Sequence, residues 1–242
     1  YALAAARGLR DAGHDVEVWG RPKAYPLKEA ERLGLKARPL SGLSELLSLR
    51  RAFKGVEVID ARTGSSHTLA LAVAQSLRNP PKVVRTRADA RPVRRGPGSG
   101  MLWSRTAGFI APTRAILDEF RARFPEFAGP SATVYPGFET PPAPGAEPEG
   151  PLQVGIVARL DPVKGHSDFL QAAAQVALQY PEARFLIAGR EENVKRGRLE
   201  AMVSNLGLRG RAQVLGHVPD ALAFMRGCPV GVVASPGSEA VS

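Results

Sequence analysis

Residues 152–189, LQVGIVARLDPVKGHSDFLQAAAQVALQYPEARFLIAG, decide the fold. A short apolar run at 152–158 is followed by a stretch with helical periodicity at 167–179, and a second apolar run follows at 185–188. Strand, helix and strand in this order are typical of a βαβ unit, in which a helix joins two parallel strands. The stretch therefore predicts an α/β fold with mostly parallel sheets.

The same alternation continues on both sides of this stretch. We expect further strands at residues 15–19, 56–59, 83–86, 109–111, 213–215 and 230–234. We expect further helices at residues 1–12, 43–53, 67–77, 113–124, 198–206 and 220–225. The run at 56–59 contains Val56, Val58 and Ile59, and we expect that strand to be buried.

The chain is expected to form two α/β halves joined by a proline-rich segment. Residues 136–151, PGFETPPAPGAEPEGP, contain six prolines and no apolar periodicity, which is typical of a restrained linker. We place the first domain at 1–138, the linker at 139–151 and the second domain at 152–242. The chain starts within a helix and stops where a strand should lead into one, so we expect a fragment that lacks both ends of the fold.

Composition narrows the possible classes of protein. Among 242 residues there are 33 Lys and Arg against 23 Asp and Glu, a formal net charge of +10. The single cysteine, Cys228, excludes an internal disulfide and a cysteine zinc cluster, and it favours a reducing cytoplasm. No run of about 18 apolar residues occurs, which argues against a membrane-spanning helix. The scattered basic residues fit phosphate-bearing partners or an anionic membrane surface, or reflect composition alone.

The turn VARLDPVKGH, residues 157–166, carries the strongest chemical signal. It places Arg159 at the end of a strand, Lys164 five residues later and Gly165 at the start of a helix. Two cations beside a helix N-terminus suit a phosphate group, because the exposed N–H groups and the helix dipole also favour an anion. The alternative is a solvated loop with incidental basic residues.

Other predicted strands end in turns that would reach the same edge of the sheet. Gly189 would let the backbone approach a flat ligand, and LGHVP at 215–219 forms a second turn. A third turn, 235–239, ends in Glu239, whose carboxylate could accept hydrogen bonds from sugar hydroxyl groups. Alternatively, Glu239 interacts only with a helix dipole.

These motifs together resemble the retaining nucleotide-sugar glycosyltransferases of the GT-B fold, in particular glycosyltransferase family 4 (group 1). The resemblance is specific in the second half, and it rests there on VARLDPVKGH, FLIAGR (185–190), VLGHVPD (214–220) and SPGSEAVS (235–242). In the first half it rests on AAARGLRDAGHDVEVWG (4–20), VEVIDARTGSSH (56–67) and VVRTRADARP (83–92). The last two segments are similar to lipopolysaccharide-type members, which implies cell-envelope glycan synthesis.

The resemblance implies two Rossmann-like domains, an acceptor-side domain followed by a nucleotide-sugar-binding domain, and it assigns roles within the second. Arg159 and Lys164 would bind the diphosphate of the donor. Glu239, the first acid of a Glu-x7-Glu motif, would lie against the donor sugar. The turn at His217 and Val218 would meet the nucleotide base through backbone atoms. The remaining donor-side residues are Gly165, Gly189 and Ser238.

The resemblance also implies that the site needs no cofactor and no metal ion, and that parts of the family's motifs lie outside this chain. The donor, a nucleoside-diphosphate sugar, is a substrate, so no cofactor is expected. The chain has no Asp-x-Asp pair, which agrees with a metal-independent site. The second acid of the Glu-x7-Glu motif would fall at position 247, and the family's glycine-rich first loop would precede residue 1, so this polypeptide alone is expected to be catalytically impaired.

The acceptor side departs from the family pattern. Ala88 stands where many relatives have a histidine, so His67, at another strand-to-helix junction, and Arg87 become the candidates for contact with a glycan or lipid-linked acceptor. His67 has an alternative interpretation as a helix cap or a solvated residue. His14, His166 and His217 are interpreted as structural.

Two other interactions were weighed for the basic surface. Arg94, Arg95 and Arg105 flank Met101, Leu102 and Trp103, which suits either peripheral contact with an anionic membrane, at its inner face, or an ordinary loop packed on its domain. A nucleic-acid-binding protein would also explain the net charge, but aromatic residues make up only 6% and no recognised module occurs, so no specific nucleic acid is expected. A GT-B epimerase or phosphorylase remains the alternative enzyme.

Overall fold

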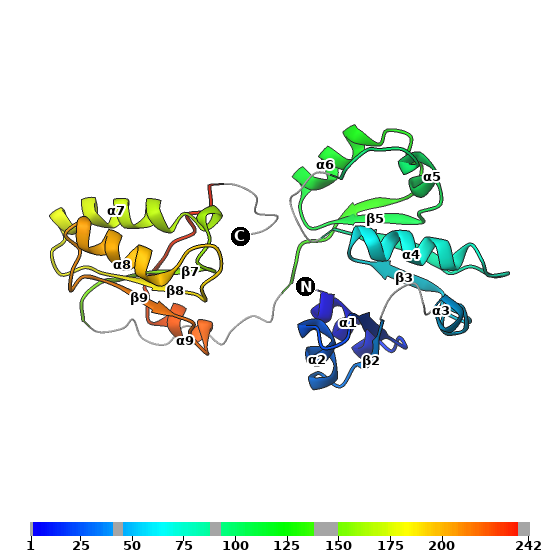
Figure 1. Cartoon of the computed structure of the whole chain (residues 1–242), viewed down its shortest axis with the longest axis horizontal. Coiled ribbons are helices and arrows are strands. Elements are labelled where there is room, and N and C mark those ends of the chain that lie inside the picture. The colour runs from blue at the N-terminus through cyan, green and yellow to red at the C-terminus, as the bar shows by residue number, and fades with distance from the viewer. Residues whose placement is uncertain (1, 41–45, 88–92, 138–149, 237–242) are drawn as a thin grey trace. The chain divides into compact units, whose positions relative to one another are not determined.

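A computed structural model describes residues 2–40, 46–87, 93–137 and 150–236 of the chain. The chain divides into two compact units, Tyr1–Glu139 and Thr140–Ala240, and each is considered by itself. In both units helices pack beside parallel sheets (Figure 1). The α/β fold with parallel sheets predicted from the sequence is confirmed. Most of the predicted linker lies outside the described residues.

The first unit contains two parallel sheets, one of order β1-β2 and one of order β3-β4-β5-β6. Its strands are β1 (Glu17–Gly20), β2 (Lys36–Pro39), β3 (Val58–Ala61), β4 (Lys82–Thr86), β5 (Gly108–Ala111) and β6 (Ser131–Thr133). Its helices are α1 (Ala2–Asp11), α2 (Tyr25–Arg32), α3 (Leu46–Ala52), α4 (Gly64–Ala74), α5 (Ser99–Ser104) and α6 (Arg114–Arg123).

An aromatic cluster forms part of the core of the first unit. The ring centroid of Trp103 lies 4.7 Å from that of Phe120 and 5.3 Å from that of Phe124, and the rings of Phe109 and Phe120 stack at 3.7 Å. Only 3% of Trp103 is exposed. Of the two interpretations of the stretch around Trp103, the structure therefore favours packing on the domain, because a buried ring cannot anchor the chain to a membrane.

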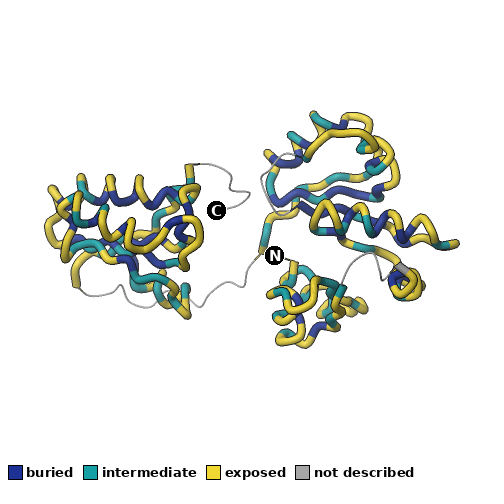
Figure 2. Tube along the Cα trace, viewed as in Figure 1, coloured by how far each residue is buried: buried dark blue, intermediate teal, exposed yellow. Residues whose placement is uncertain are grey.

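The second unit has one parallel sheet of order β10-β7-β8-β9. Its strands are β7 (Gln153–Val157), β8 (Arg184–Ala188), β9 (Ala212–Gly216) and β10 (Val230–Gly231). Its helices are the 3₁₀ turn η2 (Pro162–Lys164), α7 (His166–Gln179), α8 (Arg196–Asn205) and α9 (Ala221–Arg226). Buried residues concentrate on the strands and on the helix faces that cover them (Figure 2), and they include Ile156, Leu170, Phe185, Ile187 and Leu199.

Some details differ from the sequence-based expectations. The predicted buried strand at 56–59 is β3, which forms an edge of its sheet among the described strands, and Val58 is exposed there. The β-branched residues at 56–59 therefore do not indicate a central strand. The strand predicted at 230–234 pairs with β7 only over Val230–Gly231. The elements α2, β2, α5 and β6 were not predicted.

Candidate functional site

The carboxyl ends of β7, β8 and β9 meet at one edge of the sheet in the second unit. The N–H group of Ala158 donates to the carbonyl of Ala188 at 2.9 Å, and the N–H group of Gly189 donates to the carbonyl of Gly216 at 2.7 Å. These bonds continue the sheet past the strands and fix the starts of the turns that follow. Three of the turns singled out in the sequence are therefore neighbours.

The turn after β7 is held by Asp161. Its carboxylate accepts a hydrogen bond from the N–H group of Val163 at 3.1 Å and another from Nδ2 of Asn193 at 2.5 Å. The Val163 N–H group, followed by the Asn193 amide, holds the pKa of Asp161 below its usual range. Asp161 therefore stays ionised near neutral pH and fixes the 3₁₀ turn that carries Lys164.

His166 ties the end of β7 to the start of α7. Its Nε2 atom lies 2.9 Å from the carbonyl oxygen of Arg159, and the side chain is buried. Burial lowers the pKa of His166, so the ring is neutral near pH 7. No side chain caps the N-terminus of α7, whose first residue is His166. The first N–H groups of this 14-residue helix are thus placed to meet an anion.

The two cations of the turn differ in their surroundings. Arg159 is 45% exposed, and its Nη1 atom lies 2.8 Å from Oε1 of Glu192. Lys164 is half-buried. Two cations close to the start of a long helix form a positively charged rim that favours a multiply charged anion.

The other predicted donor-side residues have varied positions. A Cβ atom added to Gly189 would approach the carbonyl oxygen of Ala158 to 1.7 Å. The backbone of Ala158 therefore occupies the space that a side chain at 189 would need, while the role of Gly189 beside a ligand stays a prediction. His217 is exposed and Val218 half-buried, directly after β9. Ser238 and Glu239 lie outside the described residues.

The acceptor-side candidates lie in the first unit, and both are buried. His67 is 2% exposed, with Nε2 2.9 Å from Oγ1 of Thr106 and its ring 5.1 Å from that of Trp103. Burial, followed by the charge of Arg85, lowers the pKa of His67 to about 4. His67 is therefore neither a cap nor a residue that faces a cleft. The N–H group of Arg87 donates to the carbonyl of Ile110 at 2.8 Å. Ala88 lies outside the described residues.

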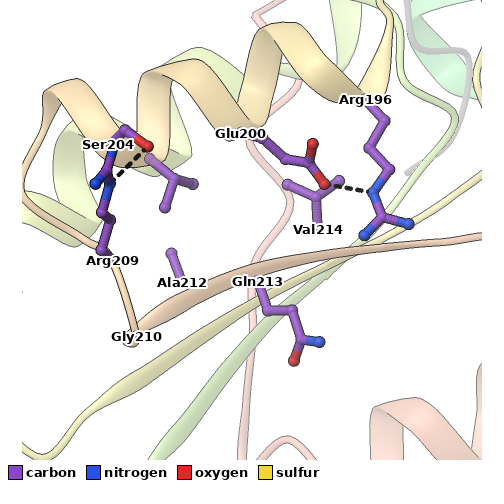
Figure 3. A pocket seen from close by; sticks show the side chains of 9 residues that line it. Arg196, Glu200, Ser204, Arg209, Gly210, Ala212, Gln213 and Val214 are labelled. Carbon is purple, nitrogen blue, oxygen red and sulfur yellow. Dashed lines mark hydrogen bonds and ion pairs between the residues drawn. The ribbon is translucent and has the colours of Figure 1, made fainter.

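Two open cavities lie away from the basic turn. One of ≈ 260 Å³ lies beside α8 and β9 (Figure 3), where Nε of Arg196 is 2.6 Å from Oε1 of Glu200 and Nε of Arg209 donates to Ser204 at 3.1 Å. The other, of ≈ 400 Å³, is in the first unit and is lined by Trp19, Arg38, Pro39, Ser48 and Ala52. Neither cavity is lined by Arg159 or Lys164.

Sequence reasoning assigned no role to Asp161 within the basic turn and did not connect Asn193 or Glu192 with that turn. The only signal for Glu192 and Asn193 was their place just after a predicted strand. Within the described ranges, no three His, Cys, Asp or Glu side chains gather closely enough to hold a metal ion. No helix formed by those residues has the length and apolar character that a membrane span requires.

Comparison with protein families covers both units. The family model described as Glycosyltransferase Family 4 matches residues 1–140, and the one described as Glycosyl transferases group 1 matches residues 138–240. A search of curated protein sequences gave no match.

Solved structures share the fold at low sequence identity. Alr3699/HepE of Anabaena in complex with UDP is 18% identical with a TM-score of 0.80, and the match covers 98% of this chain and 70% of HepE. A glycosyltransferase from Rickettsia africae is 14% identical with a TM-score of 0.82, over 98% of this chain and 69% of its own. The lipopolysaccharide outer core galactosyltransferase WaaB is 12% identical with a TM-score of 0.63, over 86% of this chain and 61% of its own. These likenesses show the GT-B fold.

Proposed function

Because the chain belongs to glycosyltransferase family 4, we propose that it transfers a sugar from a nucleoside-diphosphate sugar to an acceptor hydroxyl, with retention of anomeric configuration. The observation that supports this proposal is the fixed basic turn at the carboxyl edge of the second sheet. There Arg159 and Lys164 lie next to the uncapped start of α7. The UDP bound to HepE makes a uridine diphosphate the first donor to test.

The reaction explains why cations belong at this edge. As the glycosidic bond of the donor breaks, negative charge grows on the leaving diphosphate, so preplaced positive groups stabilise the transition state more than the ground state. Arg159 can bind two phosphate oxygens, whereas Lys164 contributes a compact charge. Together with the N–H groups of α7, they would perform the role that a divalent cation has in metal-dependent enzymes.

Other residues complete the proposed donor site. The resemblance assigns the backbone at His217 and Val218 to the nucleotide base and Glu239 to the donor sugar, with Ser238 as a further donor-side residue. A carboxylate suits this position because it accepts hydrogen bonds from sugar hydroxyl groups. The neutral, buried ring of His166 would act only by holding the carbonyl of Arg159.

The acceptor is proposed to be a glycan or lipid-linked molecule of the cell envelope. The structural likeness to WaaB supports this class, and Arg87 remains the candidate on the acceptor side. The enzyme would then act in the cytoplasm. Any peripheral contact with the inner face of an anionic membrane would have to be made without the buried Trp103, through exposed neighbours such as Met101.

Calorimetric titration of the chain with UDP, ADP and GDP, with and without a chelator, tests the donor site first. We expect one nucleotide to bind, and we expect Arg159→Ala and Lys164→Ala to weaken it at least tenfold. The matched control is Arg209→Ala, whose guanidinium contacts Ser204 away from the turn. If Arg159→Ala, Lys164→Ala and Arg209→Ala all bind as the unmodified chain does, the basic turn has no part in donor binding.

A turnover assay with the corresponding nucleotide sugar and a glycan acceptor tests the reaction, in a protein that also carries the glycine-rich first loop and the second acid of the Glu-x7-Glu motif that the resemblance implies. Each of the two substitutions is expected to lower the rate about 10²- to 10³-fold, as the loss of a transition-state anion contact does. The anomeric configuration of the product, read by NMR, decides between retention and inversion. Transfer that stops in the presence of the chelator would contradict metal independence.

A further inference from the structure

A single carboxylate bridges two arginines at the basic turn. Glu192 lies with Oε1 2.8 Å from Nη1 of Arg159 and with Oε2 3.8 Å from Nε of Arg190. The Glu192 side chain is 36% exposed and that of Arg190 is 69% exposed. Neither Arg190 nor Glu192 has a role in the sequence-based interpretation, so this bridge is a feature of the folded chain.

The backbone explains why the three side chains meet. The N–H group of Leu160 donates to the carbonyl of Arg190 at 2.9 Å, and that of Val194 donates to the carbonyl of Leu160 at 2.9 Å. These bonds fasten the turn after β8 to the turn after β7. Arg190 is one of the bonded residues and Arg159 directly precedes another, Leu160, so their closeness does not depend on the reach of two flexible side chains.

The bridge has the chemistry of an occupied anion site. A carboxylate oxygen pair between two guanidinium groups makes the contacts that phosphate oxygens make between two arginines. Because all three side chains are partly exposed, the bridge itself is weak. A diphosphate carries more negative charge than one carboxylate and would also contact Lys164 and the start of α7. It would therefore bind the arginines in place of the Glu192 carboxylate.

We propose that Glu192 occupies the place of the anion in the ligand-free protein, and that the donor's diphosphate displaces it and takes Arg190 as a third cation beside Arg159 and Lys164. This inference rests on the proposed function, since it concerns the same donor site. Glu192 is then a competitor of the donor, and Arg190 is a donor-binding residue.

Calorimetric titration of the full chain with UDP and with inorganic pyrophosphate tests both parts. For Glu192→Gln we expect Kd to fall about two- to fivefold, because the substitution keeps the shape of the side chain and removes the competing charge. The charge-matched control is Glu182→Gln, at an exposed position after α7. For Arg190→Ala we expect Kd to rise roughly three- to tenfold, against Arg209→Ala as control.

The double variant Arg159→Ala/Glu192→Gln shows whether the decrease in Kd caused by Glu192→Gln depends on the contact between Glu192 and Arg159. We expect the improvement given by Glu192→Gln to shrink when Arg159 is absent. A Kd for Glu192→Gln equal to or higher than that of Glu182→Gln overturns the inference, as does an undiminished gain in the double variant. A Kd for Arg190→Ala equal to that of Arg209→Ala removes Arg190 from the site.

The inference and the proposed function fail in different ways. If the unmodified chain binds neither UDP nor pyrophosphate, and ADP and GDP also fail, the proposed function is wrong. If the unmodified chain binds and the Glu192 and Arg190 variants behave as their controls do, only the inference is wrong. Circular dichroism of each variant confirms that the comparison is made between folded proteins.

Discussion

Gly165 lies directly against the backbone of Ala234. A Cβ atom added to Gly165 would come within 1.9 Å of the carbonyl oxygen of Ala234, and the φ angle of Gly165 is +69°. The contact joins the basic turn after β7 to the segment that follows β10. Four residues beyond Ala234 the sequence reaches Ser238, one of the donor-side residues that the resemblance implies.

Gly165→Ala is expected to destabilise the second unit strongly. The new methyl group meets both an unfavourable φ and a backbone atom that cannot move away alone. Gly207→Ala is the matched control, because Gly207 has the same φ of +69° and nothing within 4 Å of an added Cβ atom. We expect Gly207→Ala to cost about 1 kcal/mol and Gly165→Ala about 2 kcal/mol more.

Urea unfolding followed by circular dichroism measures both free energies of unfolding. Equal losses in the two variants would mean that the backbone angle alone matters, and that the contact with Ala234 contributes nothing.

Acid is expected to destabilise the first unit through His67. Thr106 donates its hydroxyl proton to the carbonyl of Leu102 at 2.8 Å, so its oxygen accepts from Nε2–H of a neutral His67. The pKa of His67 is about 4 in the folded chain, against 6.5 as its ordinary value. The unfolded chain therefore binds the extra proton first, and stability falls as the pH drops below about 6.5 and levels off below about 4.

Between neutral pH and about pH 5, protonation of the unfolded chain at His67 lowers the free energy of unfolding by about 2 kcal/mol. Urea unfolding of the unmodified chain and of His67→Gln, between about pH 7 and about pH 5, measures how the free energy of unfolding of each protein changes with pH. His166 titrates in both proteins, so the difference between the two slopes belongs to His67. If His67→Gln keeps the whole slope, the buried ring is not the source.

The alternation of strands and helices could be predicted from the sequence because each long element shows its own period. The elements that were missed include α5, with six residues, and β6, with three, which are too short for a period to appear. The basic turn was identified because Arg159 and Lys164 share one segment. Glu192 was not, because a hydrogen bond between Leu160 and Arg190 brings it there from the next turn.

His67 shows a different kind of error. The sequence-based helix began at His67, which would place it at a strand-to-helix junction. In the structure α4 begins at Gly64 behind the capping residue Thr63, whose side chain accepts from the N–H group of Ser66 at 3.1 Å. His67 is thus a full turn inside the helix, on the face that Trp103 covers. A shift of three residues in the helix start changed an exposed candidate into a core residue.

Trp103→Ala is expected to cost about 3 to 5 kcal/mol of unfolding free energy, since it removes the ring that contacts four phenylalanine rings of the core. Met101, in the same helix α5, is 60% exposed, so Met101→Ala is expected to change stability by less than about 0.5 kcal/mol. Chemical denaturation of the two variants measures the difference. A comparable loss in both would contradict the placement of Trp103 in the core.

Cys228 is expected to resist thiol reagents in the folded chain. The residue is buried, and desolvation raises the pKa of its thiol, which keeps the reactive thiolate scarce. Gly155 lies against it, because a Cβ atom added to Gly155 would be 2.6 Å from Sγ of Cys228. We expect Ellman's reagent to react at least ~100-fold more slowly with the native protein than with the urea-unfolded one.

Gly155→Ala should accelerate this labelling, because the added methyl group pushes the thiol out of its site. The matched control is Gly231→Ala, at the position that pairs with Gly155 in the neighbouring strand but has nothing within 4 Å of an added Cβ atom. We expect the control to label as slowly as the unmodified chain. Fast labelling of the unmodified native protein would show that Cys228 is not shielded in the folded chain, and that Gly155 is not required to make room for it.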